Sequence, residues 1–340
     1  MPKITMQDIA DALNTSRVTV WKAFNNRAGV SDTLRAQILQ KADELGYSRY
    51  TPEPTSTTPT KHKTVALIVS RPESSIFWTN IIHQIAKEFS KCSMNLIYTY
   101  VPTTSEEGYT LPATLSDGTV SGCIILNVYD VRIIRQINDL EIPKVFLDTA
   151  TSIPDSEIQG DLILLEGRQT MFQLTEYILN HGYTSLGFIG DISYAKTNAL
   201  RYEGFFDAMQ KHNLNINPAY CLDSPLDLSS YDEQILEFLE NLKELPQGFI
   251  CASDYVAHVV QSYLTSRNIR IPEDIILTGY DGNTEHPALS QLSATVQVET
   301  ATLGTRLAKQ LLFRMDNPMD SREIIYVISD IVHPSFCPTV

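Results

Sequence analysis

Residues 5–47 read TMQDIADALNTSRVTVWKAFNNRAGVSDTLRAQILQKADELGY, and the spacing of the apolar residues in this stretch predicts three short helices. Thr5 and Asp8 have the spacing of a capping box, which predicts that the first helix starts at Met6. Asn14 follows that helix at a position that suits a turn, because asparagine tolerates a positive φ better than most residues. The stretch therefore predicts a small helical domain near the N-terminus.

A second predicted helix, Arg17–Asn25, has one apolar face and one largely polar and basic face. Thr15 or Ser16 can cap its first turn, and Ser31 can cap a third helix over residues 32–45. The apolar face consists of Val20, Ala23 and Phe24, and the opposite face consists of Arg17, Val18, Trp21, Lys22 and Asn25. A helix with outward polar and basic residues at its N-terminal end is what the major groove of DNA requires. The helix pattern alone also fits a generic three-helix bundle.

The order of residues in this stretch resembles the DNA-binding domain of the lactose-repressor (LacI/GalR) family of transcription regulators. The matching pieces are Asp8-Ile9-Ala10, Thr15-Ser16, Thr19-Val20, Asn25, Val30-Ser31 and Leu45-Gly46-Tyr47. The resemblance implies that base edges are contacted by Arg17, Val18 and Lys22, and phosphates by Thr15, Ser16, Thr19 and Asn25. Thr5 and Trp21 complete the expected DNA-facing set. Trp21 stands where the family usually has a small residue, and we expect it to pack on the sugar-phosphate backbone rather than on the third helix.

Residues 48–63, SRYTPEPTSTTPTKHK, form a Pro/Thr-rich linker without an aliphatic residue. Such a segment has no apolar face to bury, so we expect it to be extended. Members of the family that the head resembles usually have a short helix here, which inserts leucines into the minor groove. This linker has no leucine, and Pro52 and Pro54 oppose a helix. We therefore predict that the linker stays extended or mobile on DNA and leaves the operator unkinked.

From Thr64 onward, short apolar runs alternate with amphipathic stretches. The runs that predict strands are Val65–Val69, Leu96–Tyr100, Gly122–Leu126, Lys144–Leu147, Leu186–Ile189, Gly248–Cys251 and Ile275–Thr278. The stretches that predict helices are 79–91, 131–138, 167–181, 198–212, 230–243, 254–267 and 300–315. This alternation predicts an α/β fold with doubly wound parallel sheets and helices on both faces. Since about ten strands are too many for one small sheet, we expect two lobes.

This part of the chain also resembles the lactose-repressor family, whose core is built like periplasmic sugar-binding proteins. The matching pieces are His181-Gly182-Tyr183, Leu186-Gly187-Phe188-Ile189-Gly190, Arg201-Tyr202-Glu203-Gly204-Phe205, Phe249-Ile250-Cys251-Ala252-Ser253-Asp254, Ile271-Pro272-Glu273-Asp274-Ile275 and Thr278-Gly279-Tyr280-Asp281. The expected domains are a helix-turn-helix head at 1–47, the linker at 48–63 and an effector-binding core at 64–340. Within the core, we expect lobe 1 at about 64–160 and 296–325, and lobe 2 at about 161–292 and 326–340.

Residues at the ends of the predicted strands indicate a site for a small polar ligand, because open α/β sheets bind ligands there. Arg201 offers a forked donor and Asp281 a carboxylate acceptor, which together can bracket neighbouring hydroxyl groups. Phe77 and Trp78 offer an aromatic face for a sugar ring, although both also fit a place in the hydrophobic core. The resemblance adds Ser70, Asp148, Thr197 and Ser253 to the site. Asp148 also fits a cap at a strand end, and we expect Asp254 to cap the helix that it begins.

Charge is unevenly distributed along the chain. Residues 1–63 hold nine lysines and arginines against six acidic residues, whereas the whole chain has a net charge of −14. A basic head on an acidic body suggests that only the head approaches a polyanion. The five cysteines stand singly, which favours reduced thiols over disulfides or a zinc site. We expect neither a secretory signal nor a membrane span, because no run approaches the roughly 18 apolar residues that a span needs.

Together these features predict a cytoplasmic, sequence-specific DNA-binding transcription regulator, and we expect a repressor. A small effector, a sugar or sugar derivative, would bind between the core lobes of a homodimer that binds a palindromic operator. The alternative is a sensor of the same fold that acts through a protein partner, with weak or lost DNA binding. Because no P-loop, GxSxG elbow or histidine-rich metal spacing is present, we expect no enzyme, cofactor or metal. No leucine heptads follow residue 329, so we expect no C-terminal tetramer bundle.

Overall fold

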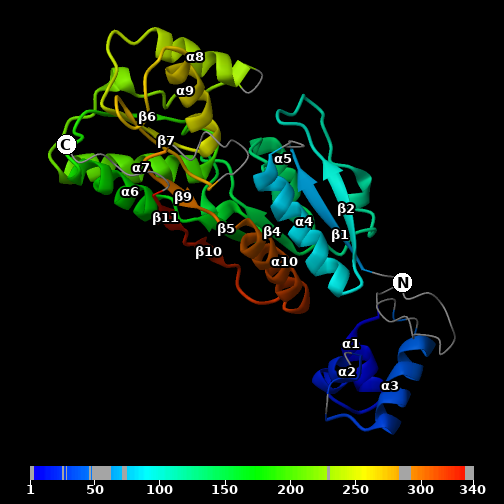
Figure 1. The fold of residues 1–340 in the computed structure, drawn as a ribbon. Helices are drawn as coiled ribbons and strands as arrows, with labels where there is room; N and C mark the ends of the chain where they lie inside the picture. The colour runs from blue at the N-terminus through cyan, green and yellow to red at the C-terminus, as the bar shows by residue number, and fades with distance from the viewer. Residues whose placement is uncertain are drawn as a thin grey trace. The chain divides into compact units, whose positions relative to one another are not determined.

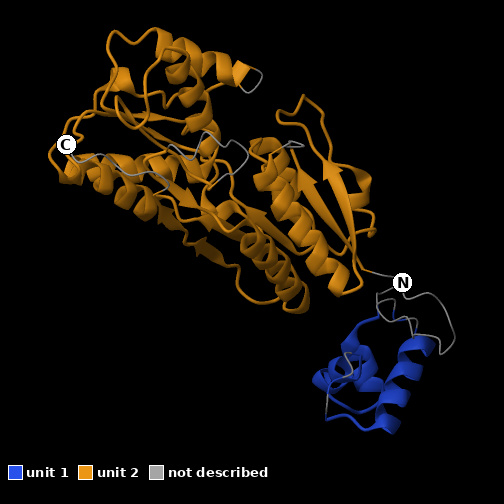
Figure 2. Cartoon of the chain, in the orientation of Figure 1, with its two compact units in different colours: residues 1–61 blue, residues 62–340 orange. Residues whose placement is uncertain are grey.

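The computed structural model describes residues 4–24, 27, 29–45, 47, 63–70, 75–227, 230–282 and 292–333. The chain forms two compact units, residues 1–61 and residues 62–340, which Figure 2 colours separately. Of the predicted linker, only Lys63 lies inside the described residues. The conformation of residues 48–62 therefore stays a prediction.

The first unit, which we call the head, contains three short helices (Figure 1). They are α1 (Met6–Ala12), α2 (Arg17–Phe24) and α3 (Asp32–Glu44). Apolar residues from all three meet in one small core, whose buried members are Ile9, Ala10, Val20, Ala23, Ile38, Ala42 and Tyr47. The Tyr47 ring stacks on Phe24, with 5.6 Å between the ring centroids, and so holds the residues after α3 against α2. These are the three helices that the apolar spacing predicted.

Polar side chains fix the beginnings of α1 and α2. Thr5 Oγ1 accepts a hydrogen bond from Asp8 N, and Asp8 Oδ2 accepts one from Thr5 N, so the predicted capping box is present. Of the two candidate caps of α2, Ser16 takes the role, because its Oγ accepts a hydrogen bond from Thr19 N at 3.0 Å. Asn14 has the expected positive φ, 48°. Local sequence thus determines where both helices begin.

The second unit, which we call the core, contains a six-stranded parallel sheet in the order β10-β5-β4-β3-β1-β2 (Figure 1). Its strands are β1 (Thr64–Val69), β2 (Asn95–Tyr100), β3 (Gly122–Leu126), β4 (Lys144–Leu147), β5 (Asp161–Leu165) and β10 (Ile324–Val327). Alternate residues of these strands face opposite sides of the sheet. One side packs on α4 (Ile76–Lys91) and α10 (Thr300–Asp316), and the other packs on α5 (Val131–Asn138). This sheet and its helices form lobe 1.

Lobe 2 is built on a three-stranded parallel sheet in the order β6-β7-β8. Its elements are α6 (Arg168–Asn180), β6 (Leu186–Ile189), α7 (Lys196–Lys211), α8 (Tyr231–Glu240), β7 (Gly248–Cys251), α9 (Asp254–Ser266), β8 (Ile276–Thr278), and the antiparallel pair β9 (Thr295–Gln297) and β11 (Asp330–Val332). Helices α6 and α7 cover one side of the sheet, and α8 and α9 cover the other. One-turn 3-10 helices lie at Ala113–Leu115, Asp155–Glu157 and Pro218–Tyr220. Both lobes therefore have the predicted doubly wound arrangement.

The boundary between the lobes differs from the expected one. We placed the start of lobe 2 at residue 161, but β5 pairs in parallel with β4 and with β10, so it belongs to the sheet of lobe 1. The sequence pattern also left β5, β9, β10 and β11 unidentified, and three of these four strands have only three or four residues. The chain crosses between the lobes after Leu165, after Gln297 and after Val327. The physical reason is that β5, β9 and β11 each have a partner strand distant in sequence, namely β10, β11 and β9, which a local pattern does not reveal.

A buried ion pair holds β5 to α10. Asp161 is fully buried, and its two carboxylate oxygens accept hydrogen bonds from Arg314 Nε at 3.0 Å and Nη2 at 2.7 Å. Gln310 Nε2 donates to the same carboxylate. Arg314 also donates to the carbonyl oxygens of Asp320 and Ser321, in the turn before β10. One guanidinium thus connects a helix, a strand and a turn of lobe 1.

We expect Arg314→Ala to lower the free energy of unfolding of the core by about 3–5 kcal/mol, because Asp161 would stay buried without its charge partner. Arg270→Ala is the matched control. Arg270 and Asp274 form an ion pair with the same 2.7 Å separation, but both side chains are exposed, so we expect almost no change. Urea unfolding followed by circular dichroism measures both variants. Equal losses of stability would contradict the role given to Arg314.

Candidate functional site

Arg201 in the second turn of α7 is a buried cation with one donor unused. Only 5% of the residue is exposed. Its Nη1 donates to Ala252 O at 2.5 Å, and its guanidinium carbon lies 3.6 Å from the centroid of the Tyr280 ring. Arg201 Nε is buried and has no hydrogen-bond partner among the described residues. A buried donor of this kind is costly unless a ligand or a water satisfies it.

Asp281, the partner of Arg201 on the next segment, stands in an unusual conformation three residues after β8. Its φ is +119°, which residues other than glycine rarely adopt. Its Oδ1 lies 3.5 Å from Arg201 Nη2, and about a fifth of the side chain is exposed. Burial, together with the nearby Asp254, raises the pKa of Asp281 to about 7 in spite of Arg201. The acceptor opposite Arg201 is therefore only loosely engaged.

Asp148, which follows β4, is surrounded by protein donors. Its carboxylate accepts hydrogen bonds from Thr197 Oγ1 at 2.5 Å, from Thr149 N at 2.8 Å and from the Tyr129 hydroxyl at 3.1 Å. Thr197 N adds a fourth hydrogen bond at 3.3 Å. Burial raises the pKa of Asp148, and these hydrogen bonds counteract the rise. The side chain thus links lobe 1 to the start of α7 in lobe 2.

Helix α7 brings the two groups together. Thr197 and Arg201 are four residues apart, so they lie on the same face of the helix, one turn from each other. The charge of Arg201 also acts on Tyr129. Burial raises the pKa of the Tyr129 hydroxyl well above its usual value, and Arg201 counteracts part of this rise. The Tyr129 ring meets Tyr194 edge to face, with 5.0 Å between centroids. We call Asp148, Thr197, Arg201 and Asp281, together with Tyr129 and Tyr280, the Arg201 cluster.

Backbone contacts join the two lobes beside this cluster. Ala150 and Ala195 form an antiparallel bridge. On either side of it, Thr151 N donates to Tyr194 O and Lys196 N donates to Thr149 O, both at 3.0 Å. Lys196 also forms an ion pair with Asp155 of lobe 1. A ligand bound at the Arg201 cluster would therefore act on a segment where the lobes already touch.

The other predicted effector residues are placed differently. Ser70 is buried at the end of β1, and Phe77 and Trp78 meet edge to face at 5.3 Å while packing on the hydrophobic core, as their alternative interpretation proposed. Among the described residues these three share no hydrogen bond or ring contact with the Arg201 cluster. Ser253 caps α9, because its Oγ accepts a hydrogen bond from Val256 N at 3.2 Å.

Asp254 does not cap α9, contrary to our expectation. It is the first residue of the helix, and its carboxylate is buried, where it accepts a hydrogen bond from Thr295 Oγ1 at 2.7 Å. Its N–H donates to Tyr280 O. The difference is physical: the side chain that precedes the first helical residue reaches the exposed amides, so Ser253 takes the cap.

The outward face of α2 carries most of the residues expected to contact DNA. Val18 and Trp21 keep 61% and 45% of their surface exposed, and Arg17 is exposed beside them. The indole of Trp21 is therefore not buried against α3. Thr5, Thr15, Ser16, Thr19 and Lys22 lie on α1, α2 and the turn between them, whereas Asn25 lies outside the described residues.

Arg35 of α3, which the sequence analysis did not single out, supports this face. Its Nη1 donates to Ala23 O at 2.8 Å and its Nη2 donates to Arg27 O at 2.9 Å. The guanidinium thus satisfies carbonyls that the end of α2 leaves without helical partners. No sequence pattern would have identified this role of Arg35, because the carbonyls that it binds belong to other segments of the head.

In the described part of the chain, no group of three or more histidine, cysteine, aspartate or glutamate side chains is arranged to hold a metal ion. No helix there is long and apolar enough to cross a membrane.

Known proteins resemble the chain over nearly its whole length. The family described as a periplasmic binding protein-like domain matches residues 175–332. The HTH-type transcriptional repressor PurR of Pasteurella multocida is 24% identical and aligns with 96% of this chain and 97% of its own length. The ribose operon repressor of Haemophilus influenzae is 25% identical, with 93% of both chains covered. The probable repressor ExuR of Bacillus subtilis is 24% identical, with 95% of both covered.

Solved structures show the same fold. A complex of the transcriptional regulator CelR with cellobiose has a TM-score of 0.69 at 20% identity, covering 97% of this chain and 98% of that one. The lac repressor dimer bound to operator and an anti-inducer has a TM-score of 0.65 at 17% identity, with the same coverage. These matches include the head as well as the core. Over nearly its whole length the chain is therefore similar to transcriptional repressors, and its fold is that of the lac repressor.

Asp281 makes the stability of the core depend on pH. The pKa of Asp281 is about 7 in the folded core, whereas its ordinary value is 3.8. At a pH between these two values, the Asp281 carboxyl is therefore protonated in the folded state and ionised in the unfolded state. The stability from this group is fully present below pH 3.8 and is lost as the pH rises toward 7. Asp281→Asn removes the titration. We expect the Tm of the wild type to fall relative to that of the variant as the pH rises from 3.8 to about 7, measured by thermal unfolding. Parallel Tm curves would contradict the raised pKa.

Proposed function

We infer that this chain is a DNA-binding transcription repressor whose core binds a small effector. The observation that carries the inference is the pairing of two features in one chain. The head presents an exposed N-terminal turn of α2 that carries Arg17, and the core holds a buried guanidinium with an unused donor. Reading DNA and sensing a ligand are the two tasks that these features support. We place this activity in the cytoplasm, where an operator is reached, and we assign no catalytic step to the chain.

The effector we propose is a small neutral carbohydrate bound at the Arg201 cluster. Arg201 Nε offers a donor and Asp281 a loosely engaged acceptor, a combination that suits neighbouring hydroxyl groups. Asp148 is filled by protein donors, so we give it a positioning role. With Asp254 also nearby, carboxylates outnumber the guanidinium, which disfavours an anionic ligand. CelR and a lactose-repressor family regulator from Enterococcus faecium have structures with cellobiose and ribose, respectively.

Control of DNA binding would follow from the position of the cluster on both lobes. Asp148 belongs to lobe 1, and Arg201 and Asp281 belong to lobe 2, so a ligand there favours one arrangement of the lobes over another. We propose that the core forms a homodimer, because one helix-turn-helix unit contacts only half of a palindromic site. A change between the lobes would then alter how two heads reach their half-sites.

The rival function is a sensor that has lost specific DNA binding and acts through a protein partner. Selection from a library of randomised palindromic duplexes, followed by gel-shift titration, separates the two. Enrichment of a defined palindrome supports the repressor. A head that retards random DNA and selected DNA equally would support the rival.

For the head, we expect Arg17→Ala to weaken binding to the selected operator more than binding to random DNA. If Arg17 makes a bidentate base contact, the difference amounts to about 1–3 kcal/mol. Lys41→Ala is the charge-matched control, because Lys41 lies on α3 and is ion-paired with Glu44. Both variants are titrated at one fixed salt concentration. Equal losses on the two DNAs would make Arg17 a phosphate contact only.

For the core, a thermal-shift screen of monosaccharides and disaccharides first identifies a ligand. We expect Arg201→Ala and Asp281→Ala each to cost about 2–5 kcal/mol of affinity for it, because one buried partner is left unpaired. Operator binding without ligand should persist. Arg168→Ala is the control, since Arg168 is exposed on α6 and paired with Asp207. Wild-type ligand response in both cluster variants would refute the site.

A further inference from the structure

The outer edge of β10 is exposed. β10 ends the six-stranded sheet, and among the described residues only β5 pairs with it (Figure 1). Ile324, Tyr326 and Ile328, which we call the Tyr326 row, have 46%, 50% and 79% of their surface exposed. On β5, the register partners of Ile324 and Tyr326 are Leu162 and Leu164, and both of these leucines are buried. The row therefore continues a hydrophobic sheet face beyond the part that helices cover.

Apart from the shortness of β10, this edge lacks the features that usually protect strand edges. Residues 324–329 read IIYVIS, without a charge, a proline or a glycine. Proteins normally place lysines, prolines or bulges on such edges, because an exposed apolar strand pairs readily with another strand. The composition of β10 therefore favours a strand that takes a partner.

The backbone of β10 shows which of its groups face outward. The carbonyl oxygens of Glu323 and Val327 accept hydrogen bonds from Leu162 N and Glu166 N, so these carbonyls point toward β5. Successive residues of a strand direct their N–H and C=O groups to opposite sides. The N–H and C=O groups of Ile324 and Tyr326, the two residues of the row that lie within β10, consequently point away from the sheet. They form a ladder of donors and acceptors on the same residues that expose apolar side chains.

A second copy of this chain suits the edge, because the segment is complementary to itself in the antiparallel direction. When Tyr326 pairs with Tyr326 of the copy across a two-fold axis, Ile324 lies opposite Ile328. The same register places Arg322 opposite Asp330 at both ends of the row. Both side chains are exposed; Arg322 donates to Ile158 O, and Asp330 begins β11, where it pairs with Gln297 of β9. A shift of two residues would lose this charge complementarity, so the charges select one register.

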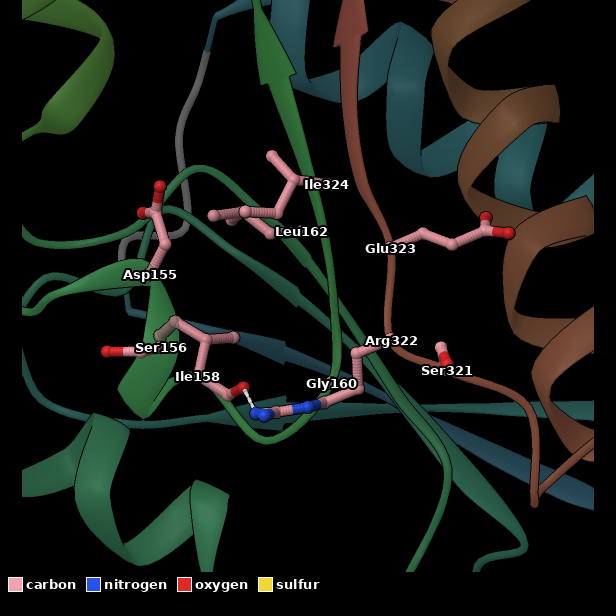
Figure 3. Close-up of a pocket in the computed structure, with 9 residues that line it drawn as sticks. All are labelled: Asp155, Ser156, Ile158, Gly160, Leu162, Ser321, Arg322, Glu323 and Ile324. Atoms are coloured by element: carbon pink, nitrogen blue, oxygen red, sulfur yellow. Dashed lines mark hydrogen bonds between the residues drawn. The ribbon is translucent and has the colours of Figure 1, made fainter.

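A depression at the start of β10 suits the side chain that this register brings there. Figure 3 shows Ile324 and Leu162 projecting side by side into it, while Arg322 crosses it to donate to Ile158 O. Ile328 of the copy would stand opposite Ile324, over these apolar side chains. The depression therefore adds apolar contact at each end of the strand pair.

We propose that this chain associates with a second copy through antiparallel pairing of their β10 edges. Stable dimers bury about 1,200–2,000 Å², more than one short strand pair supplies, so the association depends on concentration. If the core also forms the homodimer proposed above, each dimer has two β10 edges, and pairing of both edges around a second two-fold axis joins two dimers. The resulting tetramer would carry four heads and hold two operators.

Sedimentation equilibrium of the full chain without DNA tests the pairing. We expect the average mass of the wild type to rise with concentration to about twice the plateau mass of Tyr326→Lys, because a lysine on the edge opposes pairing. Ile328→Lys, at a more exposed position, serves as a second variant if Tyr326→Lys does not fold. Phe313→Lys is the matched control, since Phe313 is 40% exposed on α10, away from the edge. It should associate like the wild type.

A charge exchange tests the register. Arg322→Asp and Asp330→Arg should each weaken association, because both create like-charge pairs across the two-fold axis. The double variant with both changes should restore it. In addition, Tyr326→Cys in a Cys92→Ser background should form a disulfide between copies, since Cα atoms of such a pair lie about 5.5 Å apart.

Equal masses for the wild type and Tyr326→Lys at every concentration would overturn the proposal. A double charge variant that stays as weakly associated as the single variants would overturn the register. Gel-shift titration with one operator is run separately on the same proteins. Because association is measured without DNA, a chain that binds no operator would refute the repressor function and leave the β10 result standing.

Discussion

The start of α7 is the point on which the core depends, because its side chains bind residues of both lobes. Thr197 donates to Asp148 of lobe 1, and one turn later Arg201 reaches Asp281 of lobe 2. The Asp148 carboxylate receives all its hydrogen bonds from protein groups and is buried, so it acts as a fixed connection. The Arg201 guanidinium, in contrast, keeps a buried donor unused. A single helix turn thus joins a satisfied polar contact to one that a ligand can complete.

Strands with local apolar patterns were predictable, whereas those defined by distant partners were not. β3 was predicted to the residue at Gly122–Leu126, because five apolar or small residues stand between turn residues. β5 is as apolar but begins with Asp161, a charge that argues against a buried strand. That aspartate is buried only because Arg314 reaches it from α10. The sequence shows the charge but not the partner, which is also why the lobe boundary was misplaced.

Some residues of the candidate site could likewise be predicted from the sequence, and others could not. The fork of Arg201 and the carboxylate of Asp281 were identified by their chemistry at strand ends, and the structure brings them together. Tyr129 was missed, since a tyrosine in a loop has no periodicity, and only the folded chain places its hydroxyl on Asp148. The predicted cap of α9 was Asp254, one residue after Ser253, which caps the helix in the structure. Sequence patterns do not resolve helix starts at that precision.

The Arg201 cluster is also continuous with the segments where the chain crosses between lobes. The Tyr280 ring lies under the Arg201 guanidinium, and its hydroxyl donates to Glu166 O at 2.9 Å, directly after β5. Glu166 N in turn donates to Val327 O, the last residue of β10 before its crossing. We therefore expect a ligand that draws Arg201 away from Tyr280 to act first on two of the three crossings. The lobes would respond through buried hydrogen bonds already present, because displacing the tyrosine displaces the backbone to which it is bonded.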